Sequence, residues 1–139
     1  MISEHFKYSE FEHSDTAKKH GIYNRLTPNA KACVKALVEN VLEPLRIAWG
    51  KPLTINSGYR CKELNELVGG VESSQHRTGE ASDVACKEPY KLAQLAKDMD
   101  LPYDQLILYP TFVHFSHKFN GKQRKQILYN SAYKGQKLS

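Results

Sequence analysis

Two residues that can bind a metal lie seven positions apart in SSQHRTGEASD, residues 73–83. His76 offers a ring nitrogen and Asp83 a carboxylate oxygen, and Gly79 between them lets the backbone turn without a Cβ clash. A third candidate is His114, in the later segment TFVHFSHK. Two nitrogens and one oxygen suit Zn²⁺, whose catalytic sites keep three protein ligands and an open position for water. These residues therefore predict a site for one zinc ion, which would lower the pKa of its bound water toward neutrality.

The segments around Asp83 and His114 are expected to be strands, in which side chains alternate between the two faces. In ASDVAC, Val84 and Cys86 are expected to point into the core, which leaves Asp83 on the other face. In TFVHFSHK the valine and the second phenylalanine take the core face, which leaves His114 on the opposite one. His117 is three residues further on and falls on the face away from His114 in a regular strand. The pattern therefore favours His114 as the third ligand.

Helices are predicted from caps and from hydrophobic periodicity. The main core helix is expected to begin after Thr27, with Pro28 in its first turn, and its apolar residues keep helical spacing. Pro44 is expected to kink this helix and Gly50 to end it. Shorter helices are expected from Ser9, in CKELNELVGG and in EPYKLAQLAKDMD.

Strands are expected in KPLTINSGYR and ASDVAC, and in DQLILY and TFVHFSHK on either side of Pro110, whereas KQILYN predicts either a last strand or a helical turn. No internal repeat or long linker divides the chain, so one domain over residues 1–139 is expected. Helices early in the chain and strands later predict an α+β fold, with a small, mostly antiparallel sheet packed against helices.

The charge of the chain is unevenly distributed. The formal net charge is +5, and residues 105–139 contain six Lys or Arg and no Asp or Glu. This basic stretch favours attraction to polyanions such as acidic cell-wall polymers. A nucleic-acid partner is not expected, because the sequence contains no helix-turn-helix signature and no alternation of aromatic and basic residues. No apolar run is long enough to predict a membrane span.

The segment SGYRCKELNELVGGVESSQHRTGEASDVAC, residues 57–86, closely resembles the central block of the D-Ala-D-Ala carboxypeptidase-like zinc peptidases, the M15 peptidases. FVHFS resembles the second metal block of that family, and the resemblance covers roughly residues 25–130. The combination of SGYR, SxHxxGxAxD and VHxS is far more specific than any one of its parts. It implies the fold shared by these peptidases and the hedgehog signalling domains, with His76, Asp83 and His114 as the zinc ligands.

The same resemblance implies residues that contact a substrate. Arg60 of SGYR matches an arginine that faces the scissile carbonyl or the terminal carboxylate of the substrate, and the alternative for Arg60 is a structural ion pair. Ser74 either hydrogen-bonds the substrate or holds the loop that carries His76, and Gln75 is expected to contact the peptide backbone.

A zinc peptidase also needs a general base. Many members of the family carry an acid three residues before the last metal ligand, where this chain has Thr111, and residues 105–113 contain no carboxylate. Asp104 is the first candidate, because a tight hairpin would bring it beside residues 114–117. Glu80, between His76 and Asp83, is the second, and His117 is the third.

The function that the resemblance implies is zinc-dependent hydrolysis of an amide bond in the peptidoglycan stem peptide, either D-Ala-D-Ala or L-Ala-D-Glu. Small members of this kind include phage-type lysis enzymes. The N-terminal segment MISEHFKYSEFEHSD lacks the apolar stretch of a secretory signal, so we expect synthesis in the cytoplasm and release to the cell wall by a separate lysis protein. The alternative is a catalytically inactive zinc-binding module of the same fold that binds cell-wall peptide.

Overall fold

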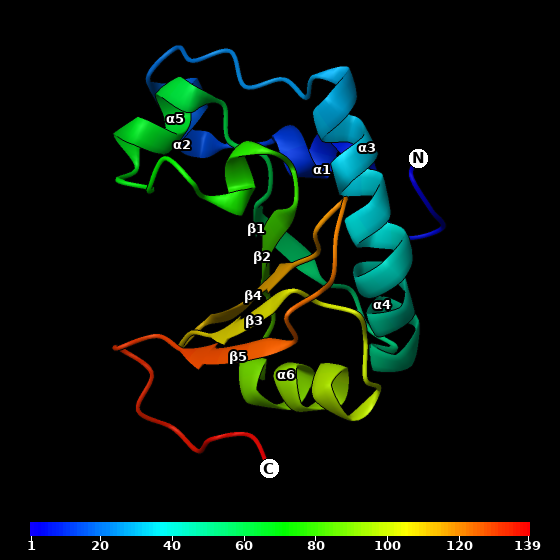
Figure 1. Ribbon diagram of the computed structural model, residues 1–139. Helices are drawn as coiled ribbons and strands as arrows, with labels where there is room; N and C mark the ends of the chain where they lie inside the picture. Colours follow the sequence, from blue (N-terminus) through cyan, green and yellow to red (C-terminus); the bar gives the residue numbers. More distant parts are fainter.

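Helices come first along the chain and most strands later, and the computed structural model describes residues 1–139 (Figure 1). In chain order the elements are α1 (Tyr8–Glu12), α2 (Asp15–Lys19), α3 (Pro28–Leu37), the π-helical turn η1 (Val38–Leu42), α4 (Glu43–Trp49), β1 (Thr54–Ser57), α5 (Lys62–Leu67), the 3₁₀ turn η2 (Gln75–Arg77), β2 (Ala81–Ala85), α6 (Pro89–Asp98), β3 (Gln105–Leu108), β4 (Phe112–Ser116) and β5 (Gln126–Tyr129).

The predicted core helix is a continuous column made of α3, η1 and α4. The Thr27 side chain accepts a hydrogen bond from the Ala30 N–H at 3.1 Å and so caps the first turn, in which Pro28 lies. The irregularity expected at Pro44 takes the form of the π-helical turn just before α4, because a proline nitrogen cannot donate the hydrogen bond that would continue a regular α-helix. Gly50 ends the column in a left-handed conformation, with φ +74°.

The five strands form one sheet in the order β1-β2-β4-β3-β5. The pairs β1–β2, β2–β4 and β3–β4 are antiparallel, whereas β5 runs parallel to β3. The prediction of an α+β fold is confirmed, but the prediction of a mostly antiparallel sheet is wrong, because the sheet is mixed. The physical reason is the path of residues 117–125: β4 ends where β3 begins, and a strand that starts from that end beside β3 must run in the same direction as β3.

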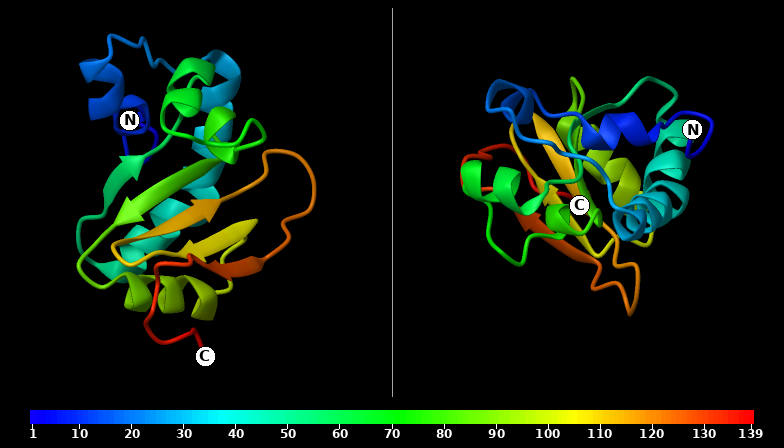
Figure 2. Two further views of the ribbon diagram at one scale, coloured as in Figure 1. Left: turned by 90° about the vertical axis from the view of Figure 1, so that its left-hand side faces the viewer. Right: turned by 90° about the horizontal axis from the view of Figure 1, so that it is seen from above.

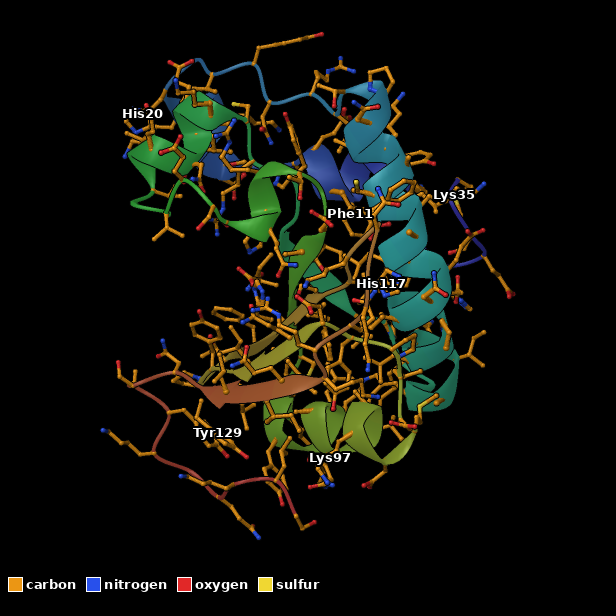
Figure 3. All side chains as sticks on the ribbon, in the orientation of Figure 1. Phe11, His20, Lys35, Lys97, His117 and Tyr129 are labelled. Carbon is orange, nitrogen blue, oxygen red and sulfur yellow. The ribbon has the colours of Figure 1, made fainter.

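The two faces of the sheet have different surroundings. The α3–α4 column and α6 lie on one side, and the left view of Figure 2 looks onto the opposite, open face with the column behind the strands. Val113 and Phe115 of β4 are fully buried toward the helices, as expected from their alternation with His114. Lys35 and Lys97 lie on the outer sides of α3 and α6, away from the sheet (Figure 3). No helix of the structure is both long and apolar enough to span a bilayer.

The loop that precedes β2 packs against α3 through a glycine. Gly79 has φ +88°, and a Cβ built on it would lie 2.7 Å from the Ala30 carbonyl oxygen and 3.2 Å from Val34 Cγ2. Both the backbone conformation and the close approach therefore require glycine at this position. Residues 74–80, which we call the metal loop, are held in this way against the helix column.

Substitution of Gly79 should therefore be costly. We expect Gly79→Ala to lower the free energy of unfolding by about 3 kcal/mol, because it adds a clash with Ala30 to the strain of a positive φ. Gly121→Ala is a matched control, since Gly121 has φ +98° but a Cβ there would meet nothing within 4 Å; it should cost only about 1 kcal/mol. Urea unfolding of the two variants measures the difference, and equal losses would contradict the packing argument.

Candidate metal centre

The structure brings the three predicted ligands together on the open face of the sheet. Asp83 and His114 are register partners on the neighbouring strands β2 and β4, and His76 lies in η2 of the metal loop. Asp83 Oδ1 lies 2.9 Å from His114 Nδ1 and 3.4 Å from His76 Nε2. One ligand atom from each of the three residues falls within 4.8 Å of the others, and all three side chains are buried.

Backbone groups of residues 57–60 orient His76 through hydrogen bonds. The His76 Nδ1–H donates to the Gly58 carbonyl oxygen at 2.7 Å, which leaves Nε2 unprotonated and directed toward Asp83. The backbone N–H of Arg60 donates to the His76 carbonyl oxygen at 2.9 Å. Two separate stretches of the sequence are thus joined at the centre, and the ring has the tautomer that a metal ligand needs.

The charge on Asp83 suits a metal ligand. Burial alone would raise the pKa of this carboxyl, but the hydrogen bond with the His114 ring and the nearby His76 ring hold it well below its usual range. Asp83 is therefore ionised, and the centre offers two imidazole nitrogens and one carboxylate oxygen from closely spaced side chains. This donor set fits Zn²⁺ with three protein ligands.

The centre lies in a pocket of about 500 Å³. Arg60 is half-buried in its wall, where its Nε donates to Ser57 Oγ at 3.2 Å and its Nη1 to Asn65 Oδ1 at 3.2 Å. Its Nη2 lies 3.9 Å from Asp83 Oδ2. Arg60 therefore both forms an ion pair with a metal ligand and faces the space beside it. The pocket is lined by Arg60, Val71, Ser73, Ser74, Gln75, His76, Asp83, Gln105, Ile107, Tyr109, His114 and Arg124.

The other two residues predicted to contact substrate also line this pocket, and both have structural contacts. Ser74 Oγ accepts a hydrogen bond from the His76 N–H at 3.2 Å, so this serine caps the short turn that carries the ligand. Gln75 Nε2 donates to Asp104 Oδ2 at 3.1 Å. Ser74 and Gln75 thus shape the metal loop, and their contact with substrate stays a prediction.

Asp104 is brought beside β4 as expected, but its carboxylate does not line the pocket. The residue is completely buried, and both carboxylate oxygens accept hydrogen bonds from Arg124. Burial alone would raise the pKa of Asp104, but these bonds, the Arg124 backbone N–H and Gln75 lower it to about 2. An acid with so low a pKa is a weak base at neutral pH, so the structure favours a positioning role for Asp104 over the predicted catalytic role.

The two other candidates for the base lie outside the pocket as well. Glu80 accepts hydrogen bonds from the Thr78 hydroxyl and from the Phe119 backbone N–H, and it lines a different pocket beside the start of α3. The His117 ring bonds to the Pro102 carbonyl oxygen through Nδ1 at 2.7 Å. None of the three groups considered for proton transfer therefore faces the centre directly.

Tyr109 and Arg124 are among the pocket residues that were not predicted. Tyr109 follows Ile107 by two positions, and Ile107 is the register partner of His114, so strand alternation could have placed the phenol near the centre. Burial and the charge of Asp83 raise the pKa of Tyr109, against the opposing effect of Arg60, so the phenol is a hydrogen-bond donor at neutral pH. Arg124 had no such signal, because it lies in the loop before β5.

The depressed pKa of Asp104 predicts an acid-sensitive contribution to stability. An unfolded aspartate titrates near about 3.9, so the contribution is complete above about pH 4 and is lost as the pH falls toward the folded value of about 2. We expect Asp104→Asn to lower the free energy of unfolding by about 1–3 kcal/mol at neutral pH. The difference from the wild type should shrink on acidification.

Urea unfolding at neutral pH and at several values below about pH 4 measures this difference. Glu72→Gln is the control, because Glu72 is exposed and takes part in no hydrogen bond or ion pair of the structure, so it should show neither effect. A loss in Asp104→Asn that stayed constant with pH would contradict the prediction.

Comparison with known proteins agrees with the geometry. The sequence model of the Peptidase M15 family matches residues 4–117. The zinc D-Ala-D-Ala carboxypeptidase of Streptomyces albus G is 34% identical over 80 residues, which are 57% of this chain and 30% of that protein. The aligned part thus spans about a third of the length of the curated relative. With a match over most of its length and the three candidate ligands in place, this chain belongs to the peptidase M15 family.

Proposed function

We propose that the chain is a zinc-dependent peptidase that hydrolyses an amide bond in the peptidoglycan stem peptide. The observation that carries the proposal is the convergence of His76, Asp83 and His114 in a pocket whose wall also carries Arg60. Membership of a peptidase family and the zinc carboxypeptidase relative support the same reading. The D-Ala-D-Ala specificity in the name of that relative makes this bond the first candidate, and the L-Ala-D-Glu bond is the second.

Two side chains of the pocket wall, Arg60 and Tyr109, have roles in this proposal beside the metal ligands. A bound zinc ion would supply Lewis acidity and lower the pKa of a bound water. Arg60 is held by Ser57 and Asn65, so its guanidinium can orient a carboxylate of the substrate or stabilise the developing oxyanion without reorganising. The neutral phenol of Tyr109 can donate a further hydrogen bond to the same group.

One observation favours the alternative of an inactive binding module. Asp83 is the only carboxylate that lines the pocket, and it is itself a candidate ligand. A peptide could then be bound without a carboxylate in place to accept the proton of the attacking water. Family membership and the zinc carboxypeptidase relative favour hydrolysis. Measuring turnover and peptide binding on the same protein distinguishes the two functions.

Zinc should stabilise the chain through the three ligands. At a free zinc concentration about 100 times the dissociation constant, we expect the free energy of unfolding to rise by about 2.7 kcal/mol. His76→Ala should remove this increase, because it deletes one of three ligands. Calorimetric titration and thermal unfolding with and without zinc give the measurement. His20→Ala is the control, since His20 is exposed at the end of α2; equal zinc affinity in both variants would exclude the assignment.

Loss of Arg60 should impair turnover while zinc binding is kept. We expect Arg60→Met to lower kcat/KM on muropeptides by about 100-fold, because it removes a preorganised cation beside the scissile carbonyl. Mass spectrometry of the products reports both the rate and the bond that is cut. Arg25→Met, at an exposed arginine, is the control. Stem-peptide binding with no turnover in the zinc-loaded wild type would overturn the peptidase proposal in favour of the binding module.

A further inference from the structure

We propose that Arg124 forms a second carboxylate-binding subsite, so that the chain selects peptides with an acidic group on the opposite side of the metal centre from Arg60. The inference rests on the proposed function only in taking the ligand to be a peptide. It concerns a residue that neither the family match, which ends at residue 117, nor the sequence motifs contain. Arg124 lines the same pocket as the three candidate ligands.

The guanidinium of Arg124 is held in place by a buried acid. Its Nε donates to Asp104 Oδ1 at 3.1 Å and its Nη2 to Asp104 Oδ2 at 2.7 Å, while its backbone N–H donates to Oδ1 at 2.8 Å. Since Asp104 is completely buried and also bonded by Gln75, this anchor is rigid. An arginine fixed in this way loses little conformational entropy when it binds a ligand.

The anchored guanidinium keeps donors for a ligand. Arginine has five N–H donors, and Asp104 uses the side formed by Nε and Nη2. Nη1 takes part in no hydrogen bond, and 49% of the side chain is exposed. The end of the guanidinium formed by Nη1 and the second Nη2 hydrogen can therefore bind a carboxylate in a bidentate manner.

The charges around the pocket favour an anion. Asp83 is the only carboxylate in the lining, against the two arginines Arg60 and Arg124. Asp104 does not cancel the second arginine completely, because Lys118 Nζ also lies 3.9 Å from it. Asp104, Arg124 and Lys118 together have a net positive charge. A centre loaded with a divalent metal ion is also positive, so an acidic peptide is attracted along the whole pocket.

The sheet places the two arginines on different sides of the centre. Arg60 follows β1, at one edge of the sheet, and Arg124 precedes β5, at the other edge (Figure 1). Asp83 and His114 lie on β2 and β4, between these edges. A peptide bound across the centre with one polar group at Arg60 therefore extends toward Arg124 on the other side. The group recognised there is a carboxylate, supplied either by an acidic side chain or by the C-terminus.

Binding to the metal-free protein tests the subsite, because equilibrium binding is then measured without turnover. The probes are three fluorescein-labelled forms of the pentapeptide L-Ala-D-Glu-L-Lys-D-Ala-D-Ala: the parent, a form amidated at the free carboxylate of D-Glu, and a form amidated at the C-terminus. Fluorescence anisotropy gives the dissociation constants for the wild type, Arg124→Gln and Lys122→Gln. Lys122 is exposed in the same loop and takes part in no hydrogen bond or ion pair of the structure, so its variant matches the charge change.

We expect Arg124→Gln to weaken binding of the parent peptide by about tenfold or more, whereas Lys122→Gln stays within about twofold. One of the two amidated peptides should bind the wild type and Arg124→Gln equally, and that peptide identifies the carboxylate that Arg124 recognises. The proposal is overturned if Arg124→Gln weakens all three peptides equally, if it weakens none, or if the wild type prefers no carboxylate.

A second variant controls for the fold. Arg124→Gln leaves Asp104 buried without its main partner, whereas Asp104→Asn combined with Arg124→Gln removes both charges and keeps the net charge of the chain. The double variant should lose the same binding selectivity with a thermal unfolding midpoint close to that of the wild type, and wild-type selectivity in the double variant would refute the subsite. Because binding is measured without metal, absence of turnover in the zinc-loaded protein would refute the peptidase proposal alone.

Discussion

The candidate site depends on one buried negative charge, the carboxylate of Asp83. A charge withdrawn from water must be compensated by nearby donors or cations, and here His114, His76 and Arg60 surround it. These three partners come from β4, from the metal loop and from the segment after β1. The compensation of a single carboxylate thus accounts for the convergence of segments that are distant in the sequence, and it leaves the same atoms arranged for a divalent cation.

A second buried carboxylate, Asp104, has a structural role and is not a candidate metal ligand. Its oxygens are taken up by Arg124 and Gln75, so it faces protein and not the pocket. It ties the chain after β4 to the metal loop, and the β4–β5 loop thereby contributes an arginine to the pocket wall. The two aspartates have similar burial and both have lowered pKa values. What distinguishes a candidate metal ligand from a structural anchor is which groups surround each one.

Local regularities explain most of what could be predicted. The alternation of Val113, His114 and Phe115 determines which side of β4 faces the helices, because successive side chains on a strand point to opposite faces. Thr27 and Gly50 mark the ends of the helix column through their capping preferences. The same alternation could have identified Tyr109, two residues after the register partner of His114, had the strand pairing been known.

The sequence by itself determined the three candidate ligands, the α+β class and the family resemblance, because these follow from residue types at short, regular spacings. Tertiary structure alone decided the parallel pairing of β5, the removal of Asp104 from the pocket and the entry of Arg124 into it. Each of these depends on the path of residues 117–125, a loop without periodicity. The position of such a loop follows from long-range contacts, above all the bond between a buried acid and an arginine twenty residues later, which no local pattern encodes.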